Sequence, residues 1–156
     1  APDRTVHLLW TERALDERLR AKFFPDARQS YALNYAVVRE GKVVRRRTLA
    51  EGGEGLSGER PAEGRFQVTP DRRLFVFYYV GGRGADGKAI AENRLLEILP
   101  DGVAGNPVRV PLSKPFTSCF TATVRAGSPP ANTLELLGPC ESAPLTIRYA
   151  RIRLLE

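Results

Sequence analysis

Asn-Tyr-Ala-Val-Val-Arg-Glu-Gly at residues 34–41 and Leu-Leu-Glu-Ile-Leu-Pro-Asp-Gly at residues 95–102 decide the fold. Each stretch begins with β-forming residues and ends in a turn whose last residue is glycine, which is the pattern of a strand entering a hairpin. A related segment, Arg-Tyr-Ala-Arg-Ile, follows at residues 148–152. The offset of about sixty residues between the first two copies is typical of a four-stranded blade in a radially repeating β protein.

The other strand-like segments complete an all-β pattern. If the strands of a blade are lettered A to D from the centre outward, the chain reads B-C-D, A-B-C-D and A-B-C. The sequence therefore predicts about three four-stranded antiparallel β-propeller blades, approximately at residues 1–50, 64–112 and 116–156, within a single all-β domain or propeller segment that covers residues 1–156. A β-sandwich or jelly roll is the alternative, which suits a self-contained length better but leaves the offset unexplained.

Local patterns predict four further features. Residues 6–10 are nearly all apolar, so we expect a strand that is buried on both faces. Residues 11–23 carry apolar side chains four residues apart and precede a proline, which predicts a short amphipathic helix. Residues 50–64 and 81–91 are rich in glycine and polar residues without periodicity, so we expect two exposed loops there.

The net charge of +6, carried mostly by arginine, favours an anionic partner such as an acidic carbohydrate, a nucleic acid or an acidic protein surface. Arg45, Arg46 and Arg47 form the one dense basic run, where charges commonly protect a strand edge from unwanted pairing. No aromatic residue interleaves with this run, which argues against nucleic acid. Charged residues recur at short intervals along the chain, so no segment has the apolar length needed to span a membrane.

The two cysteines are Cys119 and Cys140. If residues 116–125 and 133–140 form an antiparallel hairpin, the two side chains fall nearly opposite one another and can form a disulfide. An oxidising compartment would follow from that bond. Two buried thiols are the alternative, and the sequence leaves both readings open.

Several segments resemble the blades of BNR-repeat, sialidase-like β-propellers. They are residues 64–71 with the β-rich residues 73–79 that follow, residues 97–102 and residues 147–152. The resemblance implies an extracellular, glycan-related propeller. It does not supply a catalytic site, because the Asp-box (Ser-x-Asp-x-Gly-x-Thr-Trp) is absent, and neither the sialidase arginine triad nor the Tyr/Glu nucleophile pair can be matched.

In a propeller, the loops that join strand B to C and strand D to A converge on one face, where ligands usually bind. Here these loops are residues 11–30, 50–64, 81–92, 113–116 and 138–144. Arginine pairs bidentately with carboxylate or sulfate groups, and aromatic rings pack on sugar rings. For ligand binding we therefore single out Trp10, Arg13, Tyr79, Arg83 and Arg94.

Glycoside hydrolysis needs two carboxyl groups on either side of the scissile bond, and Glu12 with Glu59 is our candidate catalytic pair. The one histidine, His7, lies in an apolar strand without a partner at metal-ligand spacing. No glycine-rich stretch has the strand and helix context of a phosphate-binding fingerprint. We therefore expect neither a metal nor a cofactor.

These observations predict a secreted or periplasmic β-propeller segment that binds, or helps to process, an acidic carbohydrate. If it is an enzyme, it is one of the glycoside hydrolase type. The alternative is a non-catalytic assembly module whose open sheets are completed by strand pairing with another copy or with a partner chain.

Overall fold

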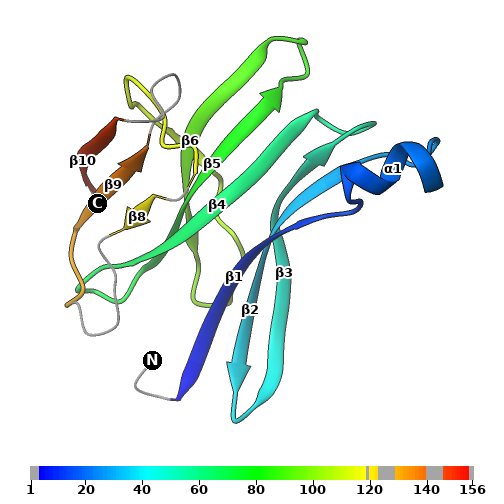
Figure 1. Cartoon of the computed structure of the whole chain (residues 1–156). Helices are drawn as coiled ribbons and strands as arrows, with labels where there is room; N and C mark the ends of the chain where they lie inside the picture. The colour runs from blue at the N-terminus through cyan, green and yellow to red at the C-terminus, as the bar shows by residue number, and fades with distance from the viewer. Residues whose placement is uncertain (1–3, 119, 123–128, 140–145, 155–156) are drawn as a thin grey trace. The chain divides into compact units, whose positions relative to one another are not determined.

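The computed structural model describes residues 4–118, 120–122, 129–139 and 146–154 (Figure 1). Cys119 and Cys140, and with them the possible disulfide, lie outside the described residues. The elements in chain order are β1 (Thr5–Arg13), α1 (Glu17–Phe23), β2 (Ser30–Arg39), β3 (Lys42–Gly53), β4 (Glu59–Val68), β5 (Leu74–Arg83), β6 (Ala89–Ile98), β7 (Val108–Val110), β8 (Thr121–Ala122), β9 (Thr133–Pro139) and β10 (Ile147–Arg153).

The strands form three antiparallel sheets, and each sheet joins strands that are consecutive in the chain: β1-β2-β3, β4-β5-β6-β7 and β8-β9-β10. This confirms the all-β class and the expected grouping of three, four and three strands. None of the three sheets is closed in the described part of the chain. The arrangement of the sheets as blades around an axis remains a prediction.

The chain divides into two compact units. The first comprises residues 1–62 with 80–90, and the second comprises residues 63–79 with 91–156. In the first unit the central strand β2 is buried on both faces: Leu33, Tyr35 and Val37 are buried on one face, and Asn34 and Ala36 are buried on the other. In the second unit an aromatic and aliphatic cluster is built around Phe77 and Phe120, whose rings meet edge to face at 5.4 Å.

The strand at residues 6–10 is longer and more exposed than its composition suggests. β1 continues to Arg13, and Val6 and Leu8 are 53% and 44% exposed. The prediction of burial on both faces is therefore wrong. β1 pairs only with β2 in the described sheet and lies at its edge, so apolar character alone did not place it in the interior.

The helix is shorter than predicted, because β1 occupies the first residues of the expected segment. It begins after Asp16, whose carboxylate accepts a hydrogen bond from the backbone N–H of Arg18 at 3.0 Å. α1 buries none of its residues, and Leu19 and Phe23 are exposed. No helix in the described part of the chain has the length and apolar character to cross a membrane.

Both expected loops are shorter than predicted. β3 extends to Gly53 and β4 begins at Glu59, while β5 extends to Arg83 and β6 begins at Ala89. A β ladder is held by backbone hydrogen bonds, so it continues through glycine and charged residues that carry no apolar periodicity. The short segments that remain, residues 54–58 and 84–88, lie beside the site described next.

Candidate functional site

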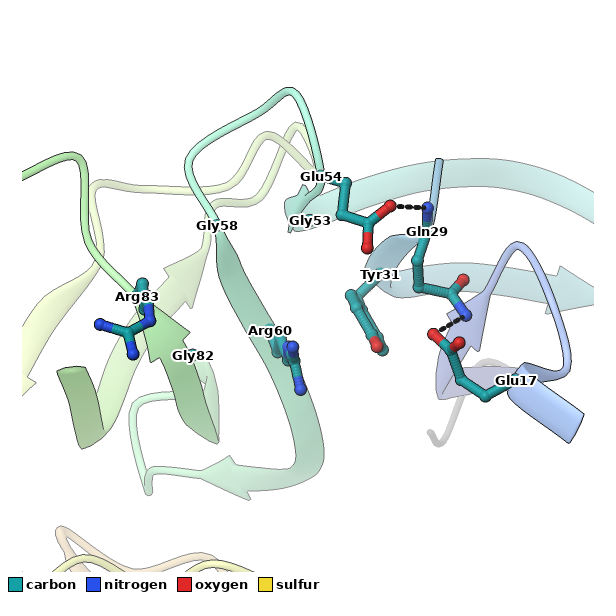
Figure 2. A pocket seen from close by; sticks show the side chains of 9 residues that line it. All are labelled: Glu17, Gln29, Tyr31, Gly53, Glu54, Gly58, Arg60, Gly82 and Arg83. Carbon is teal, nitrogen blue, oxygen red and sulfur yellow. Dashed lines mark hydrogen bonds between the residues drawn. The ribbon is translucent and has the colours of Figure 1, made fainter. Parts of the chain in front are cut away.

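A pocket of about 340 Å³ opens in the first unit (Figure 2). Its walls come from three separate parts of the chain: the segment between β1 and β2, the connection from β3 to β4, and the end of β5. These are three of the loop regions that the sequence predicted to converge. The volume lies in the range of small-molecule sites. The lining residues are Glu17, Gln29, Tyr31, Gly53, Glu54, Gly58, Arg60, Gly82 and Arg83.

Glycines allow the backbone segments around the pocket to approach one another. Gly53 has φ +124°, and a Cβ there would lie 2.3 Å from the carbonyl oxygen of Gln29. Gly82 has φ +101°, and a Cβ there would lie 2.4 Å from the carbonyl oxygen of Gly58. Both conformations disfavour any residue with a side chain, and both gaps are too small for a methyl group. The shape of the pocket therefore depends on glycine at these two positions.

Gln29 is the buried anchor of one wall. Its side chain is only 1% exposed, and its Nε2 donates hydrogen bonds to the carbonyl oxygen of Leu15 at 2.8 Å and to Glu17 Oε1 at 2.9 Å. Its Oε1 accepts a hydrogen bond from the backbone N–H of Leu15 at 3.0 Å. These three bonds tie the segment after β1 to the start of β2, and they fix the position of the Glu17 carboxylate at the pocket.

Glu54 is held by Arg20 and by the backbone. Arg20 donates from Nη1 to Glu54 Oε1 at 2.8 Å and from Nη2 to Oε2, and the Gln29 N–H donates to Oε2 at 3.0 Å. The Arg20 hydrogen bonds, with that backbone N–H, lower the pKa of Glu54 to about 2. Glu54 therefore carries its full negative charge at neutral pH and has no proton to donate.

This pKa predicts a specific loss of stability in acid. A carboxyl group whose pKa is lower in the folded than in the unfolded state stabilises the fold above its unfolded value of about 4.3, and this contribution is lost as the pH falls toward the folded value. We expect the free energy of unfolding to fall between about pH 4.3 and pH 2, and to fall less steeply in Glu54→Gln. Urea unfolding at a series of pH values measures both slopes. Equal slopes for the two proteins would show that the Arg20 pair does not stabilise the fold.

Two guanidinium groups at the pocket form no ion pair with the described residues, although the charge of Arg60 contributes to the lowered pKa of Glu54. The guanidinium of Arg60 lies 5.4 Å from the ring centroid of Tyr31, a cation–π contact. Arg83 donates from Nη1 to the carbonyl oxygen of Gly87 at 2.9 Å. Among the described residues, no acidic side chain lies within ion-pair distance of Arg60 or Arg83. The pocket thus has two guanidinium groups that can bind an anion. Its other wall presents carboxylate and amide groups.

Of the predicted site residues, only Arg83 lines this pocket. Glu12 and Arg13 line a second hollow of about 280 Å³ in the first unit, and Glu59 lines neither. Glu12 accepts a hydrogen bond from Asn34 Nδ2 at 2.6 Å. The structure therefore does not bring the proposed catalytic pair, Glu12 and Glu59, to one pocket.

The remaining predicted ligand residues are also separate from this pocket. The ring of Trp10 lies 5.3 Å from the guanidinium of Arg46. Tyr79 and Arg94 belong to the second unit. There Arg94 Nε donates to Glu92 at 2.7 Å, and Arg109 lies 3.2 Å from the same carboxylate, which makes a structural ion-pair cluster. The described residues contain no group of three or more histidine, cysteine or acidic side chains that could hold a metal ion.

Comparisons with known proteins found no match, so the function is argued from the site alone. No family model matches the chain. A search of curated proteins and a search of solved structures likewise found no match.

Proposed function

We propose that this chain is a segment of a β-propeller and that it binds an acidic carbohydrate in the pocket of the first unit. The observation that carries the proposal is the pair of guanidinium groups, Arg60 and Arg83, which line the pocket and form no ion pair with the described residues. Both side chains are exposed, so an anion from solvent can reach the two guanidinium groups.

The composition of the walls suits a sugar that bears an anionic group. Each guanidinium offers a planar fork of donors that matches a carboxylate or sulfate. The Glu17 and Glu54 carboxylates offer acceptors for sugar hydroxyl groups, and Tyr31 adds an aromatic ring (Figure 2). The volume of about 340 Å³ suits a ligand of the size of one sugar ring.

The protonation state of Glu54 favours binding over hydrolysis. A glycoside hydrolase needs one carboxyl group that is protonated near neutral pH. Glu54, with a pKa of about 2, cannot serve as that acid, and it is occupied by Arg20. Together with the separation of Glu12 from this pocket, this supports a binding module.

The sheet topology supports the propeller part of the proposal. In the B-C-D, A-B-C-D, A-B-C assignment, residues 14–29 and 84–88 join strand B to strand C, and residues 54–58 join strand D to strand A. The pocket lies beside these three connections, at the strand ends that form the ligand face of a propeller. A secreted or periplasmic location would follow from a glycan ligand.

Titration with D-glucuronate and with D-glucose tests the proposal, because the two sugars differ only in a carboxylate. We expect glucuronate to bind and glucose to bind at least tenfold more weakly, since charge-assisted hydrogen bonds contribute about 1.5–3 kcal/mol each. We expect Arg83→Gln to weaken glucuronate binding roughly tenfold or more for the same reason.

Two control variants test whether glucuronate binding depends specifically on the pocket. Arg72→Gln removes an exposed cation of the second unit and should leave glucuronate binding unchanged. Glu12→Gln alters the second hollow and should also leave it unchanged. Equal binding of the two sugars, or an Arg83→Gln variant that binds as well as the unmodified chain, would refute the proposed function.

A further inference from the structure

The pocket of the first unit carries opposite charges on its two sides. Figure 2 shows Arg83 on one side and Glu17 with Glu54 on the other, while Arg60 and Tyr31 lie between them. We call the side formed by Glu17 and Glu54 the acidic wall. The proposed anion occupies the arginine side, so the acidic wall can bind a second group of the same ligand.

A single arginine pairs with both carboxylates of the acidic wall. Arg20 donates from Nη1 to Glu54 Oε1 at 2.8 Å and from Nη2 to Glu54 Oε2. Its Nη1 also lies 3.6 Å from Glu17 Oε2, which is an ion pair but is too long for a hydrogen bond. Arg28 lies against Gly55 and does not line the pocket. Two carboxylates and one guanidinium therefore give the acidic wall, taken with Arg20, a formal charge of −1.

Glu17 keeps acceptor positions that Glu54 has filled. Glu54 accepts hydrogen bonds from Arg20 at both oxygens and a further one from the backbone N–H of Gln29. Glu17 Oε1 accepts from Gln29 Nε2 at 2.9 Å, and among the described residues no group donates a hydrogen bond to Oε2. An ionised carboxylate has about four acceptor positions. The Glu17 side chain is 48% exposed, so a ligand in the pocket can reach Oε2.

From this arrangement we infer that the ligand is a zwitterionic amino sugar. Its anionic group binds Arg60 and Arg83, and its ammonium group binds Glu17 Oε2. The inference rests on the proposed function, which places the anion at the two arginines, and it adds a second charged group to that ligand. An ammonium group has three N–H donors and compensates the formal charge of the acidic wall, which a neutral hydroxyl group does not.

Two other ligands with a positive charge fit the pocket less well. A metal ion needs several ligand atoms, and the described part of the chain has no group of three or more histidine, cysteine or acidic side chains that could supply them. An α-amino acid carries its ammonium and carboxylate groups on the same carbon, whereas Arg83 and Glu17 lie on opposite sides of the pocket (Figure 2). A sugar ring can carry its two charges on opposite edges.

The test uses four matched ligands on the full chain: glucose, glucose 6-sulfate, glucosamine and glucosamine 6-sulfate. They differ only in the amine at carbon 2 and the sulfate at carbon 6, which extend from opposite edges of the ring. Calorimetric titration at pH 6 keeps the amine protonated. We expect glucosamine 6-sulfate to bind roughly fivefold to tenfold more tightly than glucose 6-sulfate, because a charge-assisted hydrogen bond is stronger than a neutral one.

Glu17→Gln should remove this preference, so that the two sulfated sugars bind equally. Glu12→Gln is the charge-matched control, because it alters the second hollow and should leave the preference intact. Each variant raises the net charge from +6 to +7, since one anion is removed. Thermal unfolding checks that both variants remain folded.

Three results would overturn the inference. The first is equal binding of the two sulfated sugars by the unmodified chain. The second is a preference that survives Glu17→Gln, or that Glu12→Gln removes to the same extent. The third is binding of L-alanine as tight as that of glucosamine 6-sulfate, which would overturn the choice of a sugar.

The same titrations separate this inference from the proposed function. If the two sulfated sugars bind equally and both are weakened by Arg83→Gln, the ammonium contact fails and the anion site stands. If glucosamine binds through Glu17 while glucose 6-sulfate and glucuronate do not bind, the anion site fails and the contact at Glu17 stands.

Discussion

Replacing Gly82 by alanine is expected to destabilise the first unit by about 3 kcal/mol or more and to abolish sugar binding there. Its φ of +101° disfavours any residue with a Cβ, and that Cβ would lie 2.4 Å from the carbonyl oxygen of Gly58. The opposing atom belongs to the backbone, so it cannot rotate away as a flexible side chain would. The ends of β4 and β5 must separate, and this separation moves Arg83 out of the pocket. Urea unfolding measures the first effect, and titration with glucuronate measures the second.

Gly87→Ala is the matched control for this prediction. Gly87 lies in the turn that follows Gly82, has φ +77°, and has no atom within 4 Å of the position that a Cβ would take. Its substitution therefore introduces the backbone strain without the steric overlap, and should cost about 1 kcal/mol. If the two variants are equally stable, the close approach of Gly82 to Gly58 does not determine the shape of the pocket.

The strand pattern predicted the sheets but not how deeply each strand is buried. The grouping into three, four and three strands could be read from turn glycines such as Gly41 and Gly102, because local hairpins are encoded by local residues. Burial is set by what covers a strand. Residues 6–10 look like a buried strand in isolation, yet β1 is an edge strand whose Val6 and Leu8 remain exposed. No periodicity within those five residues distinguishes the two cases.

The site was predicted as a region rather than as residues. The convergence of the loop regions near residues 11–30, 50–64 and 81–92 follows from the strand order alone, and the pocket lies among them. Of the residues singled out in these regions, Arg83 lines the pocket, whereas neither Glu12 nor Glu59 does. The candidate residues were chosen by type, as acids and arginines expected on exposed loops. Gln29, which is polar and buried, was therefore not among them. A signal was present in Gly52-Gly53 and Gly81-Gly82, two glycine pairs at strand ends that indicate close backbone approach.

Gln29→Leu is expected to destabilise the first unit by about 2–4 kcal/mol. Leucine has a similar size, so the substitution leaves the volume nearly unchanged and removes the hydrogen bonds. The backbone N–H and carbonyl groups of Leu15 both lose their partner, and Glu17 loses the amide that positions its carboxylate. Because one wall of the pocket depends on these bonds, we expect glucuronate affinity to fall together with the urea midpoint of the first unit.

Glu17→Gln separates the contribution of Gln29 to stability from its role in positioning the Glu17 carboxylate at the pocket. The new amide keeps an oxygen that can accept from Gln29 Nε2, so the stability should stay within about 0.5 kcal/mol of the unmodified chain. Its effect should be confined to the ligand, since a neutral amide is a weaker acceptor for sugar hydroxyl groups than a carboxylate. A Gln29→Leu variant as stable as the unmodified chain would mean that water satisfies the Leu15 groups. In that case the wall would be held by Glu54 and Arg20 alone, and Glu54→Gln rather than Gln29→Leu would release it.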